Sequence, residues 1–206
     1  MQIRQIIPWW MAAVRTALGP VMLIGERCNW SGCGLAALVL SALASDIFDG
    51  VLARRWKCDT AGLRLFDSMA DTVFYLFVAL TLWTGRSAAL RENVPLLLAL
   101  LGLEATRYVV DLTKFGKPAS YHSYLAKSWG LVMAVAVVTA FATSGGALLI
   151  RLSLLLGLLC NAEGLAMSFI LPNWTRDVKS IAAALGLRHA QLHESARAPQ
   201  VRPLLT

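Results

Sequence analysis

The 206-residue chain is 57% hydrophobic and only 15% charged, and its mean hydropathy is +0.61. Soluble domains carry about 45–50% apolar and about 25% charged residues, so this composition excludes an ordinary soluble domain and indicates a membrane protein. The formal net charge is +7. Because most basic residues flank apolar segments, they favour contact with anionic lipid headgroups over binding to nucleic acid.

Six segments of the chain are apolar and long enough to span a bilayer, which takes about 20 residues. They lie at about 8–26, 32–55, 62–84, 94–114, 119–143 and 147–172. The stretch at about 174–196 has the pattern of a basic amphipathic helix on the membrane surface. We therefore expect an all-α protein, with a six-helix membrane domain over 1–173 and a cytoplasmic amphipathic helix and tail over 174–206.

The basic residues between these segments predict the orientation of the chain in the membrane. Cytoplasmic loops carry an excess of Lys and Arg. The richer set of alternate loops holds Arg4, Arg54, Arg55, Lys57, Lys114, Lys117, Arg176 and Lys179, and the poorer set holds Arg27, Arg86 and Arg91. Both termini are therefore expected in the cytoplasm.

Ionisable residues inside the predicted spans occur at one shared depth. Counted at 1.5 Å per residue, they lie roughly 8–15 Å from the cytoplasmic helix ends. They are Arg15, Asp46, Asp49, Asp67, Asp71, Glu104, Arg107, Lys127 and Glu163. Charges inside a membrane are costly and mark functional sites, so a shared layer predicts a polar cavity open to the cytoplasm. For Glu104, Arg107 and Glu163, ion pairs that merely hold the helices together explain the pattern equally well.

Four aspartates on two neighbouring segments form the densest part of this layer. Asp46 and Asp49 are three residues apart, and Asp67 and Asp71 are four apart, so each pair shares a helix face. Four carboxylates in a low dielectric repel one another unless cations neutralise them. Hard divalent cations suit such an oxygen set, and together with a carboxylate that accepts a proton they would serve phosphoryl transfer.

The aspartates belong to a longer motif, Asp46-x2-Asp49-Gly50-x2-Ala53-Arg54 followed by Asp67-x3-Asp71. This motif resembles the signature of the CDP-alcohol phosphatidyltransferases. One position departs from the family pattern. The second glycine of the signature is replaced by Leu63, and the glycine stands one residue earlier, at Gly62. Arg15 and Pro20 are similar to the arginine and proline of the family's first helix.

The resemblance implies an integral membrane enzyme of phospholipid synthesis that works as a homodimer, with its site facing the cytoplasm of a cell (inner) membrane. It implies that Asp46, Asp49, Asp67 and Asp71 bind Mg²⁺ or Mn²⁺, with two ions expected, and that Asp71 is the general base. The residues expected to hold the CDP group are Asp49, Gly50, Ala53, Arg54, Thr60 and Gly62. The implied reaction transfers the phosphatidyl group of CDP-diacylglycerol to a hydroxyl acceptor and releases CMP.

The acceptor is expected at the entry of the fifth segment and nearby. The candidate residues are Arg107, Ser123, Lys127 and Arg176, and their positive charges favour a phosphorylated acceptor such as glycerol 3-phosphate. Lys127 could instead be an interfacial lysine whose ammonium reaches the headgroups. Inositol phosphate, inositol, serine or a lipid acceptor remain alternatives. A small cation transporter is the alternative from another class, but it would need carboxylates on both sides of the membrane.

Overall fold

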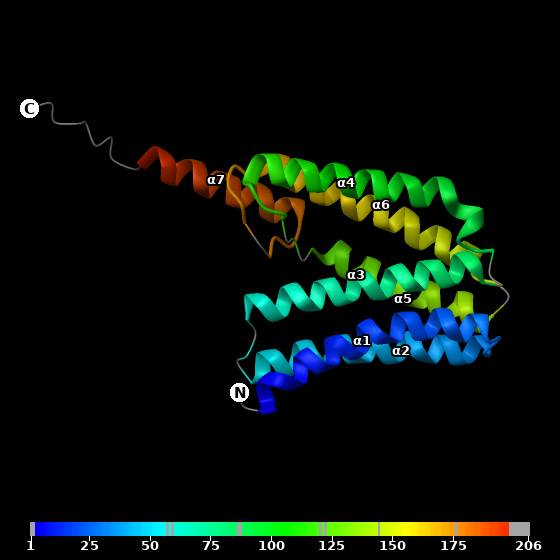
Figure 1. Cartoon of the computed structure of the whole chain (residues 1–206). Coiled ribbons are helices and arrows are strands. Elements are labelled where there is room, and N and C mark those ends of the chain that lie inside the picture. The colour runs from blue at the N-terminus through cyan, green and yellow to red at the C-terminus, as the bar shows by residue number, and fades with distance from the viewer. Residues whose placement is uncertain are drawn as a thin grey trace, which may run out of the picture. The chain divides into compact units, whose positions relative to one another are not determined.

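The computed structural model describes residues 3–56, 58, 60–85, 88–119, 121, 123–143, 145–175 and 177–197. The described residues form helices and contain no β-strand (Figure 1). The elements in chain order are α1 (Ile3–Arg27), α2 (Gly32–Arg55), α3 (Ala61–Thr84), the short 3-10 helix η1 (Arg91–Asn93), α4 (Val94–Phe115), α5 (Tyr124–Ala142), α6 (Ala147–Ile170) and α7 (Ile181–Arg197).

Each of the six predicted segments corresponds to one long helix. By length and composition, Ile6–Arg27 of α1 and the whole of α2, α5 and α6 could cross a membrane. Helix α3 qualifies only as a shorter apolar stretch, Met69–Thr84. Helix α4 carries four charged residues, which lower its hydropathy. Four candidate spans are therefore present in the described chain, and the number six remains a prediction.

Two helices begin later than the sequence predicts, each after a serine that caps it. Helix α5 starts at Tyr124 instead of 119, and the Ala126 N–H donates to Ser123 Oγ at 3.1 Å. Helix α7 starts at Ile181 instead of 174, and the Ala183 N–H donates to Ser180 Oγ at 3.3 Å. A serine at this position satisfies a backbone donor that the first turn of a helix leaves free, which explains both starting points.

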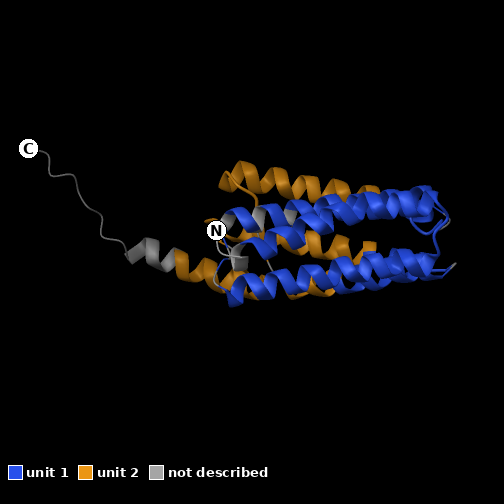
Figure 2. Cartoon of the chain, turned by 60° about the horizontal axis from the view of Figure 1, so that its bottom comes forward, with its two compact units in different colours: residues 1–97, 131–153 blue, residues 98–130, 154–206 orange. Residues whose placement is uncertain are grey.

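The chain divides into two compact units, which Figure 2 shows in different colours. Unit 1 comprises Met1–Leu97 and Leu131–Ser153, and unit 2 comprises Leu98–Gly130 and Leu154–Thr206. Unit 1 therefore contains all of α1, α2 and α3, and unit 2 contains most of α4 and α6 together with α7.

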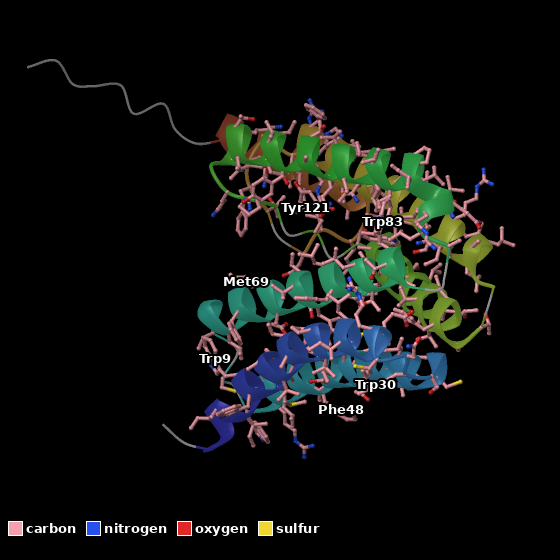
Figure 3. All side chains as sticks on the ribbon, turned by 45° about the vertical axis from the view of Figure 1, so that its right-hand side comes forward. Trp9, Trp30, Phe48, Met69, Trp83 and Tyr121 are labelled. Carbon is pink, nitrogen blue, oxygen red and sulfur yellow. The ribbon has the colours of Figure 1, made fainter. Side chains whose placement is uncertain are left out.

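Within unit 1, helix α1 packs against both α2 and α3. The packing against α3 is close at Gly19, where an added Cβ would lie 2.9 Å from Cδ2 of Phe77. Nearer the start of α1, the Trp9 ring lies 5.2 Å from the Phe66 ring. Figure 3 labels Trp9 on this helix. Small residues let helices approach closely in membranes, and this close approach brings the polar side chains of the three helices together.

Within unit 2, the start of α7 packs against the end of α6. The buried cluster consists of Met167, Leu171, Val178 and Ala184. Ala184 is fully buried, and Phe115 and Tyr121 cover the cluster from the end of α4 and the connection to α5. This apolar contact holds the first turns of α7 against the rest of unit 2.

Candidate active site

The four predicted aspartates converge on a single cation within unit 1. Arg15 of α1 donates from Nη1 to Asp46 Oδ1 at 2.8 Å, and its Nη2 lies 3.0 Å from Asp67 Oδ1. The same guanidinium also forms hydrogen-bonded ion pairs with Asp49 and Asp71. One positive charge thus faces four carboxylates, and three negative charges remain unbalanced within the described part of unit 1.

The five side chains differ strongly in their access to solvent. The side chains of Arg15 and Asp49 are 2% and 5% exposed, whereas those of Asp46, Asp67 and Asp71 keep 40%, 34% and 35% of their surface. A ligand can therefore reach this cluster from the side of Asp46, Asp67 and Asp71.

The carboxylates fit the requirements of a divalent cation. One oxygen from each of Asp46, Asp49 and Asp67 lies within 4.8 Å of the others, a spacing that one cation with oxygen ligands at about 2.0–2.6 Å can bridge. In addition, Asp67 Oδ1 is buried and accepts no hydrogen bond within the described residues, although it lies near Arg15. Asp71 is outside this group of three, although it pairs with the same Arg15 guanidinium.

The residues predicted to hold CDP lie at the end of α2 and the start of α3. An added Cβ at Gly50 would lie 3.6 Å from Nη1 of Arg54, so the bare backbone of Gly50 leaves room for that exposed guanidinium. Ala53 is buried, and Thr60 Oγ1 caps α3 by accepting from the Leu63 N–H at 3.2 Å. Gly62 is exposed.

The replacement of the signature's second glycine by Leu63 has a visible role. The Leu63 side chain is only 5% exposed and belongs to the apolar core of unit 1. At the glycine one residue earlier, Gly62, an added Cβ would lie 3.9 Å from the Trp9 ring, the nearest contact outside its own helix turn among the described residues. Leu63 therefore places an apolar side chain in the core, and the neighbouring Gly62 keeps a surface position without a side chain.

The residues predicted to read the acceptor belong to unit 2. Arg107 of α4 lies against α6 at Gly164, where an added Cβ would come within 3.0 Å of its Cδ and Nη1. Lys127 is exposed on the first turn of α5, and Ser123 is buried with its hydroxyl used as the cap of that helix. Arg176 lies outside the described residues.

A buried carboxylate in unit 2 was not among the predicted residues. Asp111 of α4 is 1% exposed, and it accepts hydrogen bonds from Ser168 Oγ at 2.5 Å and from the Ala119 N–H at 3.2 Å. Burial raises the pKa of the Tyr121 phenol, which stays protonated and can donate to Ser168 Oγ at 3.3 Å. Asp111 therefore ties the connection between α4 and α5 to α6. Asp111 lies four residues after Arg107 on the same helix face, and this spacing is the sequence pattern that could have selected it.

Replacement of Asp111 by alanine is expected to destabilise the protein by about 2–4 kcal/mol, because the Ser168 hydroxyl and the Ala119 N–H would lose a charged acceptor in a buried place. Thermal unfolding of the purified protein in detergent measures the effect. Thr113→Ala is the matched control, since Thr113 is exposed and its hydroxyl donates to the Val109 and Val110 carbonyls of its own helix. Equal stability of the two variants would contradict this assignment.

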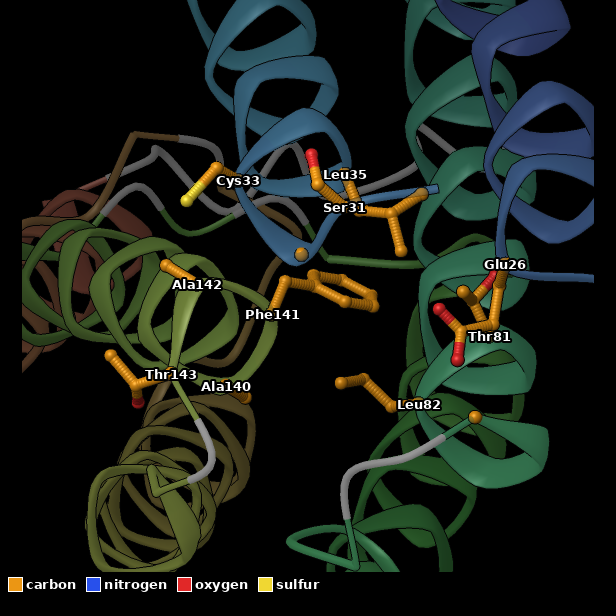
Figure 4. A pocket seen from close by; sticks show the side chains of 12 residues that line it. Glu26, Ser31, Cys33, Leu35, Thr81, Leu82, Ala140, Phe141, Ala142 and Thr143 are labelled. Carbon is orange, nitrogen blue, oxygen red and sulfur yellow. The ribbon is translucent and has the colours of Figure 1, made fainter. Parts of the chain in front are cut away.

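Unit 1 also contains a cavity of about 310 Å³ (Figure 4). Its lining residues are Glu26, Ser31, Gly32, Cys33, Leu35, Thr81, Leu82, Gly85, Ala140, Phe141, Ala142 and Thr143. They come from the end of α1, the start of α2 and the ends of α3 and α5. None of the residues predicted for metal, CDP or acceptor binding lines this cavity, so the aspartate cluster is a separate site.

The apolar helices are typical of a membrane protein, and the carboxylate cluster contains a group of three aspartates that could hold a cation. The family model of the CDP-alcohol phosphatidyltransferases matches residues 5–183, most of the chain. The protein therefore belongs to the CDP-alcohol phosphatidyltransferase family, which confirms the resemblance carried by the aspartate motif.

Among individual relatives, a Yersinia pestis (strain Pestoides F) protein named CDP-diacylglycerol–glycerol-3-phosphate 3-phosphatidyltransferase is 37% identical over 78 residues. A protein of the same name from Yersinia enterocolitica serotype O:8 is 36% identical over 69 residues. These matches span 37% and 32% of this chain, and 42% and 38% of the relatives. The similarity thus covers less than half of each relative. No solved structure is significantly similar to this chain.

Proposed function

We propose that this protein is a membrane enzyme that transfers the phosphatidyl group of CDP-diacylglycerol to a hydroxyl of glycerol 3-phosphate and releases CMP. The observation that carries the proposal is the convergence of Asp46, Asp49, Asp67 and Asp71 into one cluster with access from one side. Membership of the family supports the reaction class. The names of the Yersinia relatives support the donor and the acceptor.

The aspartates would hold Mg²⁺ or Mn²⁺, with Asp46, Asp49 and Asp67 as the primary ligands and Asp71 completing a site for two ions. The bound ions would neutralise charge on the two phosphates of the donor and so favour departure of CMP. Gly50, Ala53 and Arg54, with Thr60 and Gly62, would hold the nucleotide. The exposed guanidinium of Arg54, above the bare backbone of Gly50, suits a phosphate oxygen.

The chemical step is a displacement at phosphorus. The acceptor hydroxyl oxygen bonds to the phosphorus that carries diacylglycerol, and the bond from this phosphorus to the bridging oxygen breaks. The electron pair of that bond leaves with CMP, and the hydroxyl proton passes to the Asp71 carboxylate. Asp71 is assigned this role because it lies outside the group of three carboxylates that one cation can bridge, yet it belongs to the same cluster.

Arg107, Lys127 and Arg176 are proposed to bind the phosphate of the acceptor, with Ser123 nearby. Lys127→Ala is then expected to raise the KM for glycerol 3-phosphate about 10–100-fold, because a charge-assisted hydrogen bond is lost. The KM for CDP-diacylglycerol should change little. Initial rates at varied concentrations of each substrate measure both constants. Arg151→Ala, an exposed cation of α6 in unit 1, is the control. An unchanged acceptor KM would show that Lys127 only contacts lipid headgroups.

A competition assay tests the choice of acceptor. Purified protein is incubated with CDP-diacylglycerol, Mn²⁺ and an equimolar mixture of glycerol 3-phosphate, inositol phosphate, inositol and serine, and the lipid products are identified by mass spectrometry. Phosphatidylglycerol phosphate is the expected product. A single product from another acceptor would overturn the acceptor and keep the reaction class. If the acceptor is instead a lipid, a new phospholipid should form even when all four soluble acceptors are left out.

The proposal includes the arrangement of the chain in the membrane. Six helices, α1 to α6, would cross the bilayer of a cell (inner) membrane as a multi-pass domain over residues 1–173. Both termini and the aspartate cluster would face the cytoplasm, with residues 174–206 on that side as a surface helix and tail. The protein would act as a homodimer in contact with membrane lipids. The richer basic loops support the orientation.

A further inference from the structure

Arg15 occupies the centre of the aspartate cluster in a way that the proposed reaction does not require. Its two terminal nitrogens contact one oxygen from each of the four carboxylates. The side chain is buried, and its Nε donates to no acceptor among the described residues. Among the described residues, the guanidinium therefore forms its hydrogen bonds and ion pairs with these four carboxylates.

We infer that Arg15 is a built-in counter-ion of the aspartate cluster, which holds the four carboxylates together in the metal-free protein and which divalent cations must displace or outweigh when they bind. This inference rests on the proposed binding of divalent cations by the aspartates. It adds that the affinity for these cations is set by a residue of α1 that is not itself a ligand.

Four ionised carboxylates at this distance repel one another strongly in a low-dielectric environment, so a cation held among them stabilises the cluster. Within the described residues, the ion pairs to these carboxylates come from Arg15 alone. In the absence of metal, Arg15 therefore supplies the attraction that keeps α2 and α3 together at this level.

A bound divalent cation would compete with Arg15 for the same carboxylates. A cation that bridges Asp46, Asp49 and Asp67 would need oxygens of carboxylates that already bind the guanidinium. Even where the cation used the remaining oxygens, it would approach a fixed positive charge at close range. Both effects weaken the binding of metal, so the loss of the Arg15 charge should strengthen it.

The test measures metal affinity and stability without any turnover. Mn²⁺ binding to the purified full-length protein is followed by electron paramagnetic resonance, and thermal unfolding is recorded in EDTA and in Mn²⁺. Three variants are compared with the wild type: Arg15→Gln removes the charge, Arg15→Lys keeps it with a single donor nitrogen, and Arg151→Gln removes an exposed arginine away from the cluster.

We expect Arg15→Gln to bind Mn²⁺ about tenfold more tightly than the wild type, which corresponds to about 1.4 kcal/mol. In EDTA its unfolding temperature should fall by about 5 °C, because the carboxylates lose their counter-ion, and Mn²⁺ should restore most of the loss. Arg15→Lys should bind Mn²⁺ about threefold more tightly, since an ammonium cannot contact all four carboxylates at once. Arg151→Gln should match the wild type in both measurements.

Unchanged or weaker Mn²⁺ binding by Arg15→Lys and Arg15→Gln, with normal binding by the wild type, would overturn the inference and leave the metal site intact. Should Arg15→Gln fail to fold, the lysine variant decides between the two results. Failure of the wild type to bind Mn²⁺ would overturn both the inference and the proposed function. The two failures are therefore distinguishable.

Discussion

Asp71→Asn is expected to lower kcat for CMP release by at least about 10³-fold. An amide cannot accept the proton of the attacking hydroxyl, and loss of a general base typically costs 10²–10⁴-fold. The asparagine side chain has nearly the same shape and can still bond to Arg15, so the fold should be kept. Because Asp46, Asp49 and Asp67 form the group that one cation can bridge, Mn²⁺ binding should survive.

The rate is measured at saturating CDP-diacylglycerol and acceptor, with Mn²⁺ binding recorded on the same preparation. Glu92→Gln serves as the control, since it neutralises an exposed acid in η1 that has no place in the proposed site. Wild-type kcat in Asp71→Asn would refute the general-base role. Loss of Mn²⁺ binding together with activity would assign Asp71 to the metal site alone.

Asp49→Ala should weaken the metal site and lower the activity to at least about 10³-fold below the wild type. Asp49 is the most buried of the four aspartates, at 5% side-chain exposure, and water cannot readily take the place of its carboxylate. Removal of one of four mutually repelling charges should leave the metal-free fold intact, because Arg15 keeps three partners. We expect Mn²⁺ affinity to fall about 100-fold with little change in unfolding temperature in EDTA.

Titration of Mn²⁺ and CMP release under the same conditions check this prediction. Glu92→Gln is again the comparison, because it removes an acidic charge without touching the cluster. Retention of full Mg²⁺-dependent activity by Asp49→Ala would rule out the aspartates as the metal site. A variant that unfolds in EDTA would show instead that Asp49 is needed for the assembly of the helices.

The aspartate cluster could be predicted from the sequence because it depends on residue spacings within single helices. The three- and four-residue spacings place each aspartate pair on one face of a helix, and both pairs fall at the same depth from the predicted membrane surface. The partner of the cluster was harder to predict. No sequence pattern around Arg15 predicts that its side chain points toward α2 and α3. Its contacts with all four carboxylates depend on how the three helices pack.

Asp111 and the starts of α5 and α7 were missed for a similar reason. Asp111 lies near the end of a predicted segment, where a charge is usually solvated, and its burial depends on Ser168 and on the chain that follows Pro118. Ser123 was interpreted as a binding residue, whereas its hydroxyl caps α5. Whether it also contacts the acceptor stays a prediction. Hydrophobicity located the helices well, but their ends depend on single hydrogen bonds.

The central claim is that the aspartate cluster carries out metal-dependent phosphatidyl transfer. The most direct measurement reconstitutes the full chain in liposomes that contain CDP-diacylglycerol, adds glycerol 3-phosphate and Mn²⁺, and quantifies CMP and the new phospholipid in the same samples. We predict that CMP and phosphatidylglycerol phosphate appear in equal amounts, and that excess EDTA stops both. Formation of neither compound, or equal formation of both in EDTA, would contradict the account.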